Sequence, residues 1–138
     1  MKWAYNDGGR EAAGFKGTAG DCVVRAIAIA TGLPYQKVYD DLYQGSQRLQ
    51  KRHRGSPRNG VYKRVFRPYL EALGWKFVPT MGIGTGCRFH LRDGELPGGT
   101  IIASVSKHLV TLIDGVIQDT HDPSRDGNRC VYGYFFKA

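Results

Sequence analysis

The sequence predicts an α+β fold in which N-terminal helices pack on a C-terminal antiparallel sheet. Apolar residues recur at helical spacing in segments between residues 21 and 73, and alternate with polar residues in the segments that follow. The dipeptide Asp114-Gly115 lies between two apolar runs and is typical of a two-residue hairpin turn. Because the helical patterns precede the strands, alternating βαβ units are not expected. The 138 residues suit one domain that spans residues 1–138.

Three helical segments are predicted. The first covers residues 21–31, with Asp21 as a candidate N-cap. The second begins at Pro34, because proline is favourable in the first turn of a helix. The third covers residues 61–73, and Pro68 within it is expected to kink or split the helix because proline lacks a backbone N–H.

The remaining elements are short strands separated by glycine-rich loops. Glycine accounts for 19 of the 138 residues. That is roughly twice the usual ~7% and indicates many turns. Residues 1–20 are predicted to be irregular. The expected strands are residues 75–78, 100–106, 108–113, 116–120 and 131–136.

The net charge of +8 has a local source. Eight of the 20 lysines and arginines lie in the segment 48–67, which contains no Asp or Glu, whereas the rest of the chain has 12 basic and 12 acidic residues. Eight like charges repel one another, and a partner would relieve that repulsion. The segment is therefore a candidate for binding nucleic acid or an acidic protein. Its basic residues are Arg48, Lys51, Arg52, Arg54, Arg58, Lys63, Arg64 and Arg67.

Membrane association is not expected from this sequence. The first ten residues, MKWAYNDGGR, lack the apolar stretch of a signal peptide. No apolar run approaches the ~20 residues that a membrane-spanning helix needs. We therefore expect a cytoplasmic protein.

The cysteines predict neither a disulfide framework nor a metal site. Cys22, Cys87 and Cys130 are odd in number and form no Cys-x-x-Cys pair. Cys87 and His90 have zinc-ligand spacing, and His121 and Cys130 would be further ligands, but no second matched pair accompanies them. We therefore expect no bound metal and no other cofactor, and Cys87 and Cys130 are interpreted as core or surface residues.

Cys22 is the candidate nucleophile. It lies in the first turn of the first predicted helix, where backbone N–H groups and the helix dipole stabilise a thiolate. A small buried cysteine would fit the same position, so the assignment depends on a base placed to activate it.

His108 and Asp119 are the candidate base and its orienting carboxylate. With a turn at Asp114 and Gly115, the hairpin brings His108 opposite His121 and diagonal to Asp119, on one face of the sheet. A carboxylate that fixes the tautomer of a histidine completes a catalytic triad. A polar pair on a solvated sheet face is the alternative interpretation.

The order of these residues resembles that of the papain-like cysteine peptidase superfamily, with a cysteine at a helix N-terminus, then a histidine at a strand start, then an aspartate on the next strand. The segments that carry the resemblance are residues 20–22, 108–115 and 119–123. The pattern is most similar to the small bacterial peptidases that remove double-glycine leaders and, more distantly, to transglutaminase-like proteins. The resemblance implies a papain-like fold and a hydrolase or acyl transferase that acts on a peptide or protein. In such an enzyme Cys22 attacks a carbonyl and His108 serves as general base and acid.

The sequence leaves the oxyanion hole and the choice of aspartate open. In that superfamily a glutamine a few residues before the cysteine often completes the oxyanion hole, but no glutamine precedes Cys22. Lys16, Thr18 or the Cys22 backbone N–H are the candidates for this role. The leader peptidases carry Asp-Pro after the histidine strand, which nominates Asp122, whereas the hairpin register favours Asp119.

Two functions are therefore expected as alternatives. The first is a cysteine hydrolase, a peptidase or amidase, that uses Cys22, His108 and Asp119. The second is a non-catalytic module that binds nucleic acid or an acidic protein through residues 48–67. Since the basic segment contains none of the three candidate catalytic residues, it is expected to influence which partner is bound rather than the chemistry.

Overall fold

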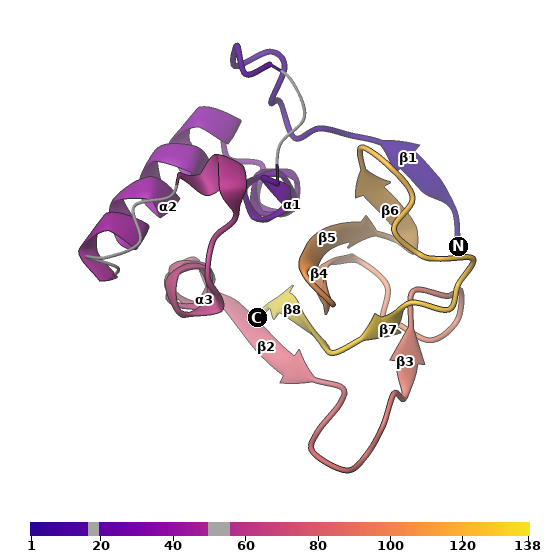
Figure 1. Ribbon diagram of the computed structural model, residues 1–138. Coiled ribbons are helices and arrows are strands. Elements are labelled where there is room, and N and C mark those ends of the chain that lie inside the picture. Colours follow the sequence, from indigo (N-terminus) through magenta and orange to yellow (C-terminus); the bar gives the residue numbers. More distant parts are fainter. Residues whose placement is uncertain (17–19, 50–55) are drawn as a thin grey trace.

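The computed structural model describes residues 1–16, 20–49 and 56–138. Over these residues the chain forms a mixed α+β structure with three α-helices and a mostly antiparallel six-stranded sheet (Figure 1), which confirms the predicted class. The helices are α1 (Cys22–Thr31), α2 (Tyr35–Leu49), the 3-10 turn η1 (Pro57–Asn59) and α3 (Lys63–Ala72). The strands are β1 (Trp3–Tyr5), β2 (Trp75–Pro79), β3 (Phe89–His90), β4 (Thr100–Val105), β5 (His108–Ile113), β6 (Val116–Asp119), β7 (Cys130–Val131) and β8 (Gly133–Lys137).

The main sheet has the strand order β1-β6-β5-β4-β8-β2, and β3 pairs with β7 in a separate two-stranded sheet. Neighbouring strands of the main sheet are antiparallel except β1 and β6, which are parallel. β1 lies in the segment predicted to be irregular, so that prediction is wrong for Trp3–Tyr5, because three residues are too short to show an alternating pattern. Tyr5 lies opposite Asp119, so β1 supports the strand that carries this carboxylate.

The β5–β6 hairpin has the predicted register, with Thr111 paired to Gln118. Asp114 and Gly115 have φ values of 48° and 80°. Both values are positive, as a type I′ turn requires, and the Asp-Gly pair tolerates them. The predicted turn is therefore confirmed.

The three helices follow the sequence patterns with one exception. α1 ends before Gly32, whose φ of 74° is left-handed and whose N–H donates to the Ala28 carbonyl at 3.0 Å. α3 is continuous through Pro68, so of the predicted kink or split the split is not found. Pro68 is exposed, so water can satisfy the carbonyl that it leaves without an intrahelical donor. Among the described residues, no helix has the length and apolar character needed to cross a bilayer.

Apolar side chains cover both faces of the main sheet. On one face the three helices pack around Phe135, and Thr111 Oγ1 of β5 donates to the Ala26 carbonyl of α1 at 2.6 Å. On the other face Ile117 packs in a cluster with Val131 of β7. α1 contacts β4, β5 and β6, so it lies over the middle of the sheet.

A disulfide joins Cys87 to Cys130 and connects the loop before β3 to β7. The expectation of unpaired cysteines is therefore wrong for these two residues. His90 of β3 pairs with Cys130 of β7, and this local pairing brings the two cysteines together across 43 residues of sequence. The disulfide also occupies both thiols of the zinc-ligand set considered from the sequence. Cys22 is left as a free thiol.

Candidate active site

A cleft of about 510 Å³ lies where α1 and α3 begin and where β4 turns into β5. Its volume falls within the ~300–1,000 Å³ range of ligand pockets. Both Cys22 and His108 line it, so the folded chain brings the predicted nucleophile and base to one cleft. The described lining residues are Gly20, Cys22, Val23, Arg25, Gly60, Val61, Lys63, Phe66, Ser104, Val105, Lys107, His108, Leu109 and His121.

Cys22 is the first residue of α1 and its thiol is half-buried. Burial acts to raise the pKa of the Cys22 thiol, but the hydrogen bond with His108, the charge of that imidazole and the Leu109 backbone N–H together lower it below its usual value. Asp21 occupies the N-cap position without a side-chain capping bond, so its carboxylate does not occupy the N–H groups of the first turn. The surroundings therefore favour a thiolate at Cys22.

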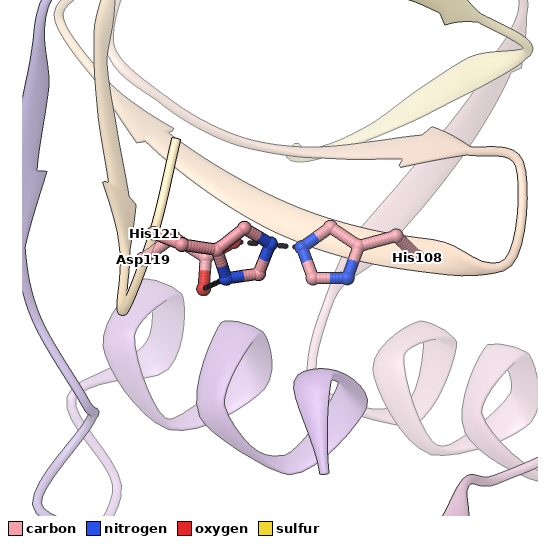
Figure 2. A group of neighbouring side chains, drawn as sticks. All are labelled: His108, Asp119 and His121. Carbon is pink, nitrogen blue, oxygen red and sulfur yellow. Dashed lines mark hydrogen bonds and ion pairs between the residues drawn. The ribbon is translucent and has the colours of Figure 1, made fainter. Parts of the chain in front are cut away.

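His108 begins β5 and Asp119 ends β6, and their side chains meet (Figure 2). His108 Nε2 lies 2.7 Å from Asp119 Oδ2. Burial acts to lower the pKa of His108, but its hydrogen bonds and charge interactions with Asp119 and Cys22 raise it to about 9. Burial likewise acts to raise the pKa of Asp119, and the contact with His108 lowers it below the usual range. Asp119 and Cys22 therefore both favour the protonated form of the imidazole.

The structure brings Asp119, rather than Asp122, to His108. Asp119 is only 4% exposed. Asp122 is exposed and accepts a hydrogen bond from the Ser124 backbone N–H at 2.9 Å. His121 lies beside the pair, as the predicted register implied, with its ring 5.3 Å from that of His108. The hairpin thus settles which aspartate can orient the histidine.

Arg25 is a buried residue of this site that the sequence analysis did not identify. Its Nη1 donates to Thr120 Oγ1 at 2.6 Å and lies 3.4 Å from Asp119 Oδ1. Its Nε lies 3.2 Å from Asp21 Oδ1, and Arg10 Nε lies 3.0 Å from the other oxygen of Asp21. Arg25 therefore connects the start of α1 to the end of β6. The sequence feature that could have identified Arg25 is that it is the one charged residue in α1.

Of the predicted oxyanion donors, the structure describes two, Lys16 and the Cys22 backbone N–H. Lys16 does not line the Cys22 cleft but a neighbouring cavity of about 620 Å³. Its carbonyl accepts hydrogen bonds from Arg10 and Arg58. Thr18 lies outside the described residues. The backbone N–H of Cys22 remains, at the first position of α1.

Three cations of the basic segment lie against aromatic rings. Lys63 Nζ is 4.3 Å from the centroid of the Phe77 ring, and the Arg67 guanidinium is 5.1 Å from the same centroid. The Arg64 guanidinium is 5.5 Å from the Tyr62 centroid. These distances suit cation–π contacts, so the three charges also contribute to packing within the chain.

Two further described cations of the segment are Arg58 and Arg48. Arg58 Nη2 donates to the Lys16 carbonyl at 2.8 Å. Arg48 lies in the last turn of α2, where a cation suits the helix dipole. Binding of nucleic acid or an acidic protein by residues 48–67 stays a prediction. The remaining cations, Lys51, Arg52 and Arg54, lie outside the described residues.

One group of described side chains could hold a metal ion: His108, Asp119 and His121, whose potential ligand atoms lie within 4.8 Å of one another (Figure 2). His108 Nε2 and Asp119 Oδ2 already share a hydrogen bond of 2.7 Å. A metal would have to displace the proton between them. The present contacts therefore match a histidine oriented by a carboxylate.

Cys22 and His108 thus line one cleft, and Asp119 forms a hydrogen bond with His108. Among known proteins, no family model, no curated protein and no solved structure matches this chain.

Proposed function

We propose that the protein is a papain-like cysteine hydrolase that cleaves a peptide or amide bond by thiol-mediated acyl transfer. The observation that carries the proposal is the series of Cys22, His108 and Asp119, with a free thiol at a helix N-terminus and a buried carboxylate behind the imidazole. Nucleophile, base and orienting group are the three parts that a covalent hydrolase needs.

The proposed reaction begins at the sulfur. His108 Nε2 is hydrogen-bonded to Asp119, so Nδ1 is the ring nitrogen that exchanges a proton with Cys22. The thiolate attacks the substrate carbonyl carbon and the C=O electron pair moves to oxygen. When the tetrahedral intermediate collapses, the C–N bond breaks and the amine takes the proton from His108. Water then attacks the thioester, His108 accepts its proton, and the Cys22 sulfur leaves.

The oxyanion formed in both steps needs hydrogen-bond donors. The Cys22 backbone N–H is the first of α1 and has no intrahelical acceptor. It also lies at the positive end of the helix dipole. This N–H is therefore the proposed donor that the chain's own geometry supplies.

The test compares wild type with Cys22→Ala and Cys22→Ser in hydrolysis of an internally quenched peptide library, with and without a chelator. Each substitution should lower hydrolysis at least ~1,000-fold, because the nucleophile is lost. Iodoacetamide should add once to the wild type near neutral pH and not to Cys22→Ala, since Cys87 and Cys130 are disulfide-bonded.

Two outcomes would contradict the proposal. One is a Cys22 that reacts no faster than a small free thiol. The other is hydrolysis that survives in Cys22→Ala but is lost with the chelator and restored by zinc. The second result would assign His108, Asp119 and His121 to a metal instead.

A further inference from the structure

The cleft at Cys22 has an uneven distribution of charge. Its described lining residues include Lys63 and Lys107 but no Asp or Glu. The undescribed segments 17–19 and 50–55 contain no Asp or Glu in their sequence either. Much of the remaining wall is apolar, with Val61 and Phe66 among its members. Charges beside such a wall are less screened than charges in open solvent.

Two carboxylates contact residues of this cleft, and both are paired with cations. Asp119 is buried between His108 and Arg25. Asp21 is 2% exposed and lies between Arg10 and Arg25. Neither carboxylate is therefore available to balance a lysine at the cleft mouth.

Lys107 is held at the cleft by the turn between β4 and β5. Val105 pairs with His108, so Ser106 and Lys107 form the turn that leads directly into the catalytic histidine. Lys107 has a φ of 55°, a left-handed value that glycine or asparagine adopts at lower cost. Arg129 donates to the Ser106 carbonyl and thereby supports this turn. Lys107 is exposed, and its left-handed backbone would be less strained with glycine or asparagine at this position.

Lys63 also lines the cleft, at the first position of α3. Acidic residues are favoured in the first turn of a helix, yet neither α1 nor α3 has one there. Lys63 rests over the ring of Phe77, and in the described part of the chain neither Lys63 nor Lys107 forms an ion pair. Two cations with no counter-ion among the described residues thus line the same cleft as the nucleophile.

We propose that the cleft selects substrates that carry an acidic side chain next to the bond cleaved at Cys22. Lys63 and Lys107 bind that carboxylate, and the apolar wall strengthens the attraction. Both lysines are specificity residues, since neither belongs to the series of Cys22, His108 and Asp119. The inference rests on the proposed function, because it requires acyl transfer at Cys22.

The test uses two alkylating probes of similar size, iodoacetate and iodoacetamide, on the full chain at low ionic strength. The measured quantity is the alkylation rate with iodoacetate divided by the rate with iodoacetamide, and the small thiol N-acetylcysteinamide is the reference. At Cys22 this ratio should be at least about threefold higher than for the reference, and it should fall as salt is added. The double variant Lys63→Gln/Lys107→Gln should lose this excess while its iodoacetamide rate stays within about twofold of wild type.

The matched control is Lys2→Gln/Lys76→Gln, which removes the same charge at exposed positions outside the cleft. It should keep the wild-type ratio. A quenched peptide with Glu beside the cleaved bond should likewise be hydrolysed faster than its Gln counterpart by the wild type but not by the Lys63→Gln/Lys107→Gln variant.

The failures of the two proposals are distinguishable. If Cys22 reacts rapidly with both probes, but with the ratio of the small thiol and no change in the double variant, the acidic-substrate inference is overturned and the hydrolase proposal stands. If Cys22 reacts with neither probe faster than the small thiol, the hydrolase proposal fails, and the inference fails with it.

Discussion

At the scale of single residues, the protonation of His108 controls the proposed chemistry. The folded chain holds the pKa of His108 at about 9 and lowers that of Cys22. The thiolate and imidazolium therefore coexist from the lowered pKa of Cys22 up to about pH 9. Above that pH the thiolate persists but His108 can no longer protonate the leaving amine. Hydrolysis should then fall while alkylation of Cys22 continues.

The Asp119→Asn variant tests this assignment through the pH profile of kcat/KM. Asp119 is the largest of the causes that raise the pKa of His108, and burial opposes it. Without the carboxylate the pKa of His108 should fall, so the alkaline limb should move from near pH 9 to lower pH. We also expect kcat to fall by ~10²–10⁴-fold, because the imidazole loses its orienting acceptor.

The matched control for that experiment is Asp122→Asn. Asp122 is exposed and contacts the backbone of its own loop. The Asp122→Asn variant should leave the pH profile of kcat/KM unchanged. If Asp122→Asn shifts the alkaline limb and Asp119→Asn does not, the two aspartates have been assigned the wrong way round.

At the scale of elements, α1 is attached to β6 by Arg25, which contacts Asp21 at the start of the helix and Asp119 at the end of the strand. Arg25→Met should lower the free energy of unfolding by about 3–5 kcal/mol, because it leaves buried carboxylates with fewer partners. Arg67→Met in α3 removes an exposed pair with Glu71 and a cation–π contact with Phe77, and should cost about 1 kcal/mol. Urea unfolding of both variants measures the difference, and equal losses would contradict the structural role of Arg25.

Some of these elements could be predicted from sequence patterns and others could not. The α1 helix and the β5–β6 hairpin were predictable because period and turn chemistry are local properties of the chain. β1 was not predictable, since its three residues become a strand through pairing with β6, more than 100 residues away. The continuity of α3 through Pro68 was not predictable, because the cost of a proline depends on which face of the helix meets solvent.

In the candidate site, too, some contacts were predictable from the sequence and others were not. The contact between His108 and Asp119 was predictable because it follows from the local register of the hairpin. The contacts of Arg25 with both Asp21 and Asp119 depend on how α1 docks on the sheet, which no local pattern specifies. The Cys87–Cys130 pairing was likewise set by the contact between β3 and β7.

At the scale of the whole molecule, the Cys87–Cys130 disulfide ties the loop before β3 to β7, on the sheet face opposite the helices. It closes a loop with a sequence separation of 43 residues. Replacing both cysteines by serine should lower the free energy of unfolding by about 2–4 kcal/mol, mainly because the unfolded chain gains freedom. Denaturant unfolding of oxidised and reduced wild type should show the same difference, and an unchanged midpoint on reduction would contradict it.

The same disulfide has a practical consequence for spectroscopy. With Cys87 and Cys130 joined, the native chain offers one thiol to a maleimide dye or a nitroxide spin label, so no cysteine needs to be removed first. A label on Cys22 would sit at the cleft wall and report when a ligand enters. Buffers for such work should contain little or no dithiothreitol, since a strong reductant would free two further thiols and end the selectivity of labelling.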